Sequence, residues 1–147
     1  KKYNITPEEA ENILNKKSGV YGISGISNDL RDIAKAAATG DKRAILAREL
    51  LANSIRKLIG AYISEMNGLD VLVFTAGIGE NDYEVREMVC ENLEYFGIEF
   101  DKKANKEAPR GEECVLSAPS SKVKVYVVPT NEELMIARDT AAVATNK

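Results

Sequence analysis

The sequence predicts an α/β domain, because two strands of buried type each run into a turn that opens a helix. The first is the apolar run 69–75, which leads into the glycine turn 77–81. The second is the alternating run 122–128, which leads into the acidic helix start 130–133. The remaining sequence is mostly helical, so there are few strands for the many helices that would pack on them. The sheet therefore looks too small, which indicates that strands preceding this chain are missing.

Helices dominate the N-terminal half. Thr6 can cap the first helix with Glu9 completing a capping box, and that helix is expected to end near Lys17. Residues 18–28 are predicted to be an ordered loop. Two helices are expected after it, spanning 29–38 and about 41–67, and the second is closed by Gly68. Apolar residues recur along the longer helix at spacings of three and four, so we expect it to be well buried.

The C-terminal half should hold the sheet. The run 69–75 is nearly continuous in apolar residues, which is typical of a central strand covered on both faces. Asn81 is expected to cap a helix with Glu84 in a capping box, and that helix should reach about Phe96. The later elements follow in chain order. They are a short strand at 98–100, a solvated excursion at 101–113, an edge strand at 114–117, the strand 122–128 with its valines on one face, and a final helix from Thr130.

Composition narrows the class of protein. A chain of 147 residues is one domain or a large piece of one, and a net charge of -3 gives no reason to expect nucleic acid or an anionic membrane as a partner. No apolar run approaches the ~20 residues of a membrane helix, and no secretory signal follows Lys1, so we expect a cytoplasmic protein. Cys90 and Cys114 are expected to be thiols. The sequence holds 0 histidines, which excludes histidine-based catalysis and histidine metal ligands within this segment.

The glycine turn is the first candidate site. Gly77 and Gly79 lack a Cβ atom, so a ligand can approach their backbone closely. The helix start near Asn81 would add N–H groups and a positive dipole end. The turn is neither a Walker A loop nor a dinucleotide fingerprint. The alternative is a tight strand-to-helix turn without a ligand.

The acidic helix start is the second candidate. Thr130 and Glu133 fit a capping box, which leaves Glu132 to point outward. A carboxylate in that position could hold a Mg²⁺ ion, usually through waters. The alternative is an acidic first turn that the helix dipole favours.

A third candidate lies upstream. Asp29 can cap the helix that begins there, and Arg31 can pair with a nearby acid. The functional interpretation is a clamp on the ribose or base side of a ligand. The alternative is that the two residues serve only the helix start.

Read together, three stretches resemble the C-terminal portion of acetate kinases, the acetokinase family. They are Ser18 to Asp32, Phe74 to Asn81 and Pro129 to Asp139, and their order and separation agree with the family. The resemblance implies a partial domain of the actin-like, sugar-kinase and Hsp70 ATPase type. It also implies phosphoryl transfer from ATP to acetate, giving acetyl phosphate and ADP reversibly with Mg²⁺, in a homodimer.

The resemblance also assigns residues. Asp29, Leu30 and Arg31 would contact the adenosine part of ATP or ADP, and Glu132 would be the Mg²⁺ residue. The second nucleotide loop would comprise Gly77, Ile78, Gly79, Glu80 and Asn81.

The family's catalytic residues and its acetate pocket would lie upstream of this chain, so none is expected here. The chain alone is accordingly predicted to be inactive, as the nucleotide-binding segment 1–147 of a larger enzyme. Its final helix, about 130–147, would pack on the missing N-terminal domain. Two alternatives stay open: a non-catalytic nucleotide-binding or dimerisation module, and a segment of a propionate or butyrate kinase.

Overall fold

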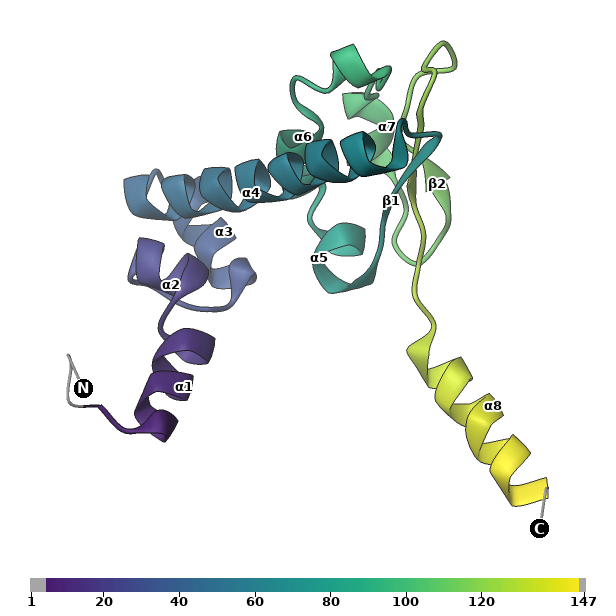
Figure 1. The fold of residues 1–147 in the computed structure, drawn as a ribbon. Coiled ribbons are helices and arrows are strands. Elements are labelled where there is room, and N and C mark those ends of the chain that lie inside the picture. Colours follow the sequence, from purple (N-terminus) through teal and green to yellow (C-terminus); the bar gives the residue numbers. More distant parts are fainter. Residues whose placement is uncertain (1–4, 146–147) are drawn as a thin grey trace. The chain divides into compact units, whose positions relative to one another are not determined.

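The structure is a computed structural model, and it describes residues 5–145. The chain divides between Glu65 and Met66 into two compact units, which are described separately below. Most elements of both units are labelled in Figure 1, where the colours follow the sequence.

The first unit is helical. Its elements are α1 (Pro7–Lys16), α2 (Gly19–Ser24), α3 (Leu30–Ala38) and α4 (Lys42–Met66, which ends just past the boundary). The capping box at the start of α1 is confirmed, since the Glu9 N–H donates to Thr6 Oγ1 at 3.2 Å and the Thr6 N–H donates to Glu9 Oε2 at 2.7 Å. The loop predicted at 18–28 is wrong in part, because 19–24 form α2. Gly25 ends this helix in the left-handed region at φ 71°.

The core of this unit is small and lies at one end of α4. It comprises Ile33, Ala44 and Ala47, each 0% exposed. The buried residues of α4 all fall in its first half: Ala44, Ala47, Arg48 and Ala52. The expectation of a well-buried long helix is therefore wrong. Its apolar stripe continues to the end of α4, but Leu58 and Tyr62 there are 57% and 62% exposed.

The second unit is built around a mixed three-stranded sheet in the order β1-β3-β2. The strands are β1 (Val71–Phe74), β2 (Cys114–Val115) and β3 (Lys124–Val127). β1 pairs with β3 in parallel and β2 pairs with β3 in antiparallel orientation. The strand expected at 98–100 is reduced to a single bridge between Phe100 and Ser117.

Two predictions about the strands fare differently. The alternation around β3 is confirmed, because Val123, Val125 and Val127 are all buried. The prediction that the first strand is central and covered on both faces is wrong. β1 is an edge of this sheet, and Val71 and Val73 are 45% and 48% exposed. Leu72 and Phe74 alternate with them and pack on the core, so β1 buries one face only.

The helix predicted from Asn81 to Phe96 is two elements, α6 (Tyr83–Cys90) and the 3₁₀ turn η1 (Glu94–Phe96). The glycine turn before it forms a short helix of its own, α5 (Ala76–Asn81). Asp82 caps α6 by accepting the Val85 N–H at 3.0 Å, whereas the Asn81 side chain turns back to donate to the Gly77 carbonyl at 2.9 Å. The capping role predicted for Asn81 is therefore wrong by one residue.

The excursion predicted at 101–113 also contains structure. Its first part is α7 (Lys102–Glu107), capped by Asp101, and Asn105 within it is 0% exposed. The final helix is α8 (Glu132–Thr145). The sheet, α6 and the segment after it enclose the core of this unit. That core comprises Cys90, Leu93, Ile98, Leu116, Val123, Val125 and Val127. Within residues 5–145, no helix combines the length and apolar character needed to cross a membrane.

Candidate functional site

The two strand-to-helix junctions of the second unit lie at the same edge of the sheet. β1 and β3 run parallel, so their carboxyl ends meet there. The Val128 N–H donates to the Phe74 carbonyl at 2.9 Å, and the Thr75 hydroxyl donates to the Val128 carbonyl at 2.8 Å. The glycine turn and the acidic helix start, far apart in sequence, are therefore neighbours.

Glu80 joins the two junctions directly. Its Oε1 accepts the Thr130 N–H at 2.8 Å and the Thr130 hydroxyl at 3.0 Å. The backbone hydrogen bond, followed by the hydroxyl, holds the pKa of Glu80 below its ordinary value of 4.5. Glu80 was predicted as a nucleotide contact. In this structure the Oε1 atom of Glu80 bonds to Thr130 and so links α5 to the segment before α8.

An open cavity of about 510 Å³ lies at this edge of the sheet. Its lining comprises Ala76, Gly77, Thr130, Asn131, Glu132 and Glu133. The structure thus brings two predicted site residues, Gly77 and Glu132, to one cavity. The other predicted residues of the turn, 78–81, are not part of this lining.

The two glycines of the turn have different surroundings. A Cβ atom placed on Gly77 would meet nothing within 4 Å, whereas one on Gly79 would lie 3.2 Å from the carbonyl carbon of Phe74. Gly79 is therefore needed for the close approach of α5 to β1, and Gly77 leaves open space beside the cavity. Ala76, at the start of α5, adopts φ 58°, in the left-handed region that costs a residue with a Cβ about 1–2 kcal/mol.

The start of α8 is capped differently from the prediction. Asn131 Oδ1 accepts the Leu134 N–H at 3.0 Å, so Asn131 is the cap. The capping box between Thr130 and Glu133 is wrong, because the hydroxyl and N–H of Thr130 bond to Glu80. Glu132 is exposed at the first turn of α8 and lines the cavity.

The carboxylates at the cavity suit a hard cation whose remaining ligands are waters and phosphate oxygens. Among residues 5–145, no three His, Cys, Asp or Glu side chains gather closely enough to form a metal site. Mg²⁺ commonly binds through one or two carboxylates, with waters and phosphate oxygens completing its shell. Glu132 fits such a role.

A buried arginine that contacts the glycine turn was not predicted from the sequence. Arg86 is 3% exposed, and its Nη1 donates to the carbonyls of Gly79 and Glu80, each at 2.8 Å. Its Nε donates to Asn105 Oδ1 at 2.7 Å. The sequence did hold a signal for this role. Arg86 falls between Val85 and Val89 on the buried face of α6, and a buried charge requires buried partners.

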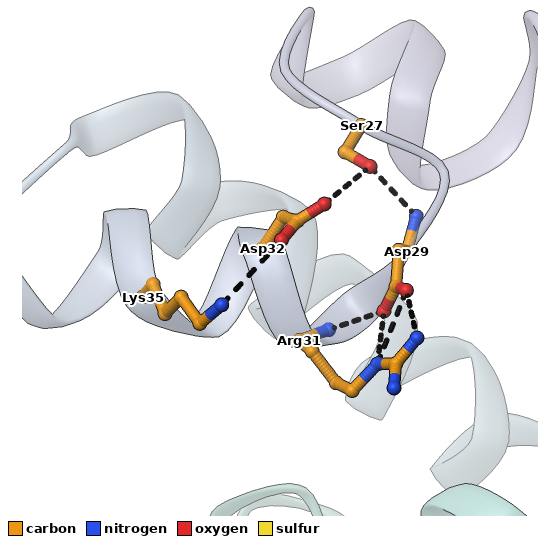
Figure 2. A network of polar contacts seen from close by, with 5 residues as sticks. All are labelled: Ser27, Asp29, Arg31, Asp32 and Lys35. Atoms are coloured by element: carbon orange, nitrogen blue, oxygen red, sulfur yellow. Dashed lines mark hydrogen bonds and ion pairs between the residues drawn. The ribbon is translucent and has the colours of Figure 1, made fainter.

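The third candidate lies in the first unit, at the start of α3 (Figure 2). Asp29 Oδ1 accepts the Arg31 N–H at 2.9 Å and so caps the helix. The Arg31 guanidinium folds back onto the same carboxylate, with Nε 3.0 Å from Oδ1 and Nη2 2.5 Å from Oδ2. The local role of both residues, cap and ion-pair partner, is confirmed.

The surroundings of this pair fix it further. Ser27 accepts the Asp29 N–H at 3.0 Å and donates to Asp32, which also pairs with Lys35 at 3.8 Å (Figure 2). The hydrogen bonds from the Arg31 side chain, and then from its N–H, lower the pKa of Asp29 to about 2. Leu30 packs on the core of its unit. The Arg31 side chain is 87% exposed, and its pairing with Asp29 sets its direction.

Comparison with known proteins agrees with these motifs. The model of the Acetokinase family matches residues 1–138. The acetate kinase of Thermoanaerobacterium thermosaccharolyticum is 59% identical over 140 residues, covering 95% of this chain and 34% of that protein. The acetate kinase of Dictyoglomus turgidum is 53% identical over 146 residues, covering 99% of this chain and 36% of that protein.

A solved structure supports the fold as well. The crystal structure of Porphyromonas gingivalis acetate kinase matches with a TM-score of 0.87 at 50% identity, covering 97% of this chain and 36% of that chain. The chain thus spans about a third of the length of the relatives it matches. Its small mixed sheet with surrounding helices is a part of their α/β fold. On the family match and these identities, the chain belongs to the acetokinase family.

Proposed function

We propose that this chain supplies nucleotide and Mg²⁺ contacts for an acetate kinase reaction, the reversible transfer of the γ-phosphoryl group of ATP to acetate. The observation that carries the proposal is the cavity shared by Gly77 and Glu132 at the carboxyl ends of β1 and β3. Ligands of open α/β sheets bind at that edge. Family membership supports this choice of reaction, and the cavity supports a part for this chain in it.

The roles follow from the surroundings of each residue. The backbone at Gly77 is open to a ligand, so the turn 77–81 faces the nucleotide through this residue. Glu132 holds Mg²⁺ through water, and the ion neutralises phosphate charge when bound. In the first unit, Asp29 presets Arg31 for the adenosine part of the nucleotide, and Leu30 anchors the segment on the core.

The wider proposal concerns the whole enzyme. Acetate or acetyl phosphate, a second copy in a homodimer and a cytoplasmic location belong to the complete acetate kinase. Phosphoryl transfer requires groups that position the reactants and neutralise charge on the transferred phosphoryl. We infer that these groups lie in parts of the relatives outside the matched third, so this chain binds nucleotide without transferring phosphate.

The test is isothermal titration of the purified chain with ADP and Mg²⁺. Gly77→Val places a branched side chain into the open space beside the cavity and should abolish saturable binding. Gly60→Val is the matched control, because a Cβ at Gly60 in α4 also meets nothing within 4 Å. Loss of binding in both variants, or in neither, would contradict a nucleotide site at Gly77.

Two further variants test the finer roles. Glu132→Gln keeps the size of the side chain and removes its charge, so binding of ADP should lose its dependence on Mg²⁺. Arg31→Gln should weaken binding of ADP and of adenosine by the same factor, since the proposed contact is to the adenosine part. An unchanged adenosine affinity would remove Arg31 from the site.

The two alternatives are separated by restoring activity. The N-terminal part of a full-length relative is added to this chain, and acetyl phosphate formation is measured. Restored turnover supports a kinase segment, whereas binding without any restored turnover supports a non-catalytic module. A propionate kinase of Francisella tularensis matches with a TM-score of 0.80 at 38% identity, so acetate, propionate and butyrate are compared as acceptors in the same assay.

A further inference from the structure

The turn that faces the cavity rests on a buried polar network. Arg86 of α6 donates Nη1 to the carbonyls of Gly79 and Glu80, Nε to Asn105 Oδ1 at 2.7 Å, and Nη2 to the Asn105 carbonyl at 3.2 Å. The guanidinium thus connects the end of α5 to α7. Every distance here is typical of a formed hydrogen bond.

Asn105 holds this arginine in place. It is 0% exposed, and its Nδ2 donates to the Tyr83 carbonyl at 2.8 Å while its Oδ1 accepts from Arg86. Both ends of the amide are therefore committed. An amide with both ends bonded has one orientation, so it fixes the orientation of the guanidinium in turn.

Stability alone does not explain a charge in this position. Removing a guanidinium from water is costly, and apolar residues of similar volume often serve a core equally well or better. What an apolar residue could not do is hold two backbone carbonyls. Gly79 and Glu80 lie in the last turn of α5, where helix carbonyls lack partners within the helix.

We propose that Arg86, oriented by Asn105, is a positioning residue for the turn 77–81. By fixing the carbonyl end of the six-residue α5, it sets the direction of the backbone at the other end, where Ala76 and Gly77 line the cavity. The consequence for ligand affinity rests on the proposed nucleotide function. The consequence for the backbone of α5 does not.

The experiment uses the complete 147-residue chain and two readouts, namely amide hydrogen exchange and the Kd for ADP with Mg²⁺. Asn105→Leu removes both ends of the amide at similar volume. Asn105→Asp keeps the acceptor for Arg86 and is the conservative variant. Val123→Ala, which removes buried volume from the core under the sheet, controls for a general loss of stability.

The expected result is selective loosening of α5. In Asn105→Leu, exchange of the amides of residues 80–82 rises by about tenfold, the effect of losing one to two net hydrogen bonds, while the amides of β3 keep their rates. The Kd for ADP rises by a similar factor, and Asn105→Asp, which keeps only the acceptor for Arg86, gives a smaller rise in both. Val123→Ala speeds exchange throughout the unit without this selectivity.

Two results would overturn the proposal. One is unchanged exchange at residues 80–82 in Asn105→Leu, and the other is an equal rise in α5 and β3, which would mark Arg86 as a general structural residue. If the unmodified chain does not bind ADP, the proposed function fails, and exchange alone decides the role of Arg86. If Asn105→Leu does not fold, Arg86→Lys takes its place, since one ammonium cannot serve both carbonyls and Asn105 in the same geometry.

Discussion

Asp29 carries the clearest electrostatic signature among the candidate residues. It caps α3 with one oxygen and receives the Arg31 guanidinium on both, which holds its pKa at about 2 against an ordinary value of 3.8. The pair lies at the surface, so its effect on stability is small. Its value is geometric, because it fixes the direction of an exposed arginine side chain.

The pKa of Asp29 can be measured by following its carboxyl carbon by NMR from pH 6 to pH 3. We expect Asp29 to stay ionised over this range in the unmodified chain and to titrate within it in Arg31→Gln. Because the folded-state pKa is depressed, the pair contributes stability above pH 3.8 and loses it as the pH falls toward about 2. Titration of Asp29 near its ordinary value in the unmodified chain would show that the pair does not form in solution.

The two glycines of the turn should respond oppositely to alanine. Gly79→Ala forces a Cβ to within 3.2 Å of the Phe74 backbone, so we expect a loss of about 1–3 kcal/mol in the free energy of unfolding. In Gly77→Ala the new Cβ meets nothing within 4 Å, and alanine reduces the conformational freedom of the unfolded chain. The free energy of unfolding is therefore expected to rise by up to about 1 kcal/mol. Urea unfolding of both variants measures these changes. Equal changes in the free energy of unfolding would contradict the different packing of the two positions.

At the scale of elements, two local signals predicted the structure correctly, whereas a partner distant in sequence was missed. The capping box at Thr6 and the valine alternation of β3 depend on neighbours in sequence, and both are confirmed. The cap of α8 was misassigned because Thr130 bonds to Glu80, 50 residues away. No periodicity reveals such a partner.

The same reasoning applies to burial. The apolar run of β1 predicted a covered central strand, but coverage depends on which elements are present to pack on it, and in this chain β1 is an edge. Asn105 shows the opposite error. It lies in a charged stretch typical of a solvated surface, yet it is buried, and its side chain accepts a hydrogen bond from the buried guanidinium of Arg86. The candidate turns were found from sequence, whereas the residues supporting them were not.

The final helix is expected to contribute little to the stability of this chain. The described residues of α8 are all exposed, including Ile136 at 66% and Val143 at 71%. A proline inside a packed helix costs about 3 kcal/mol. We expect Ala141→Pro to lower the free energy of unfolding of the second unit by less than about 0.5 kcal/mol.

The measurement is urea unfolding followed by the amide signals of β3. Val89→Pro is the control, since Val89 is 0% exposed in α6, and it should cost about 3 kcal/mol or more. A large loss in Ala141→Pro would show that α8 packs on this chain. The earlier prediction that residues of about 130–147 pack on an N-terminal domain reaches past the described residues and stays a prediction.

At the scale of the whole molecule, each unit has a core of its own. One core is centred on Ile33 and the other on Leu116, and the two clusters share no residue. Units of this size are individually marginal, because small domains bury a smaller fraction of their surface. The candidate residues are divided in the same way, with Asp29 to Arg31 in the first unit and the cavity in the second.

This division predicts separable unfolding. Ile33 and Leu116 are both 0% exposed, and truncation of either to alanine should cost about 2–5 kcal/mol, a large part of the stability of a small unit. Ile33→Ala should therefore weaken the amide signals of 30–52 while those of β3 persist, and Leu116→Ala should do the reverse. In the double variant the losses should add to within about 0.5 kcal/mol. If either variant weakened both sets of signals together, the two units would unfold as one cooperative body. Loss of one candidate site could then not be separated from loss of the other by mutating the cores.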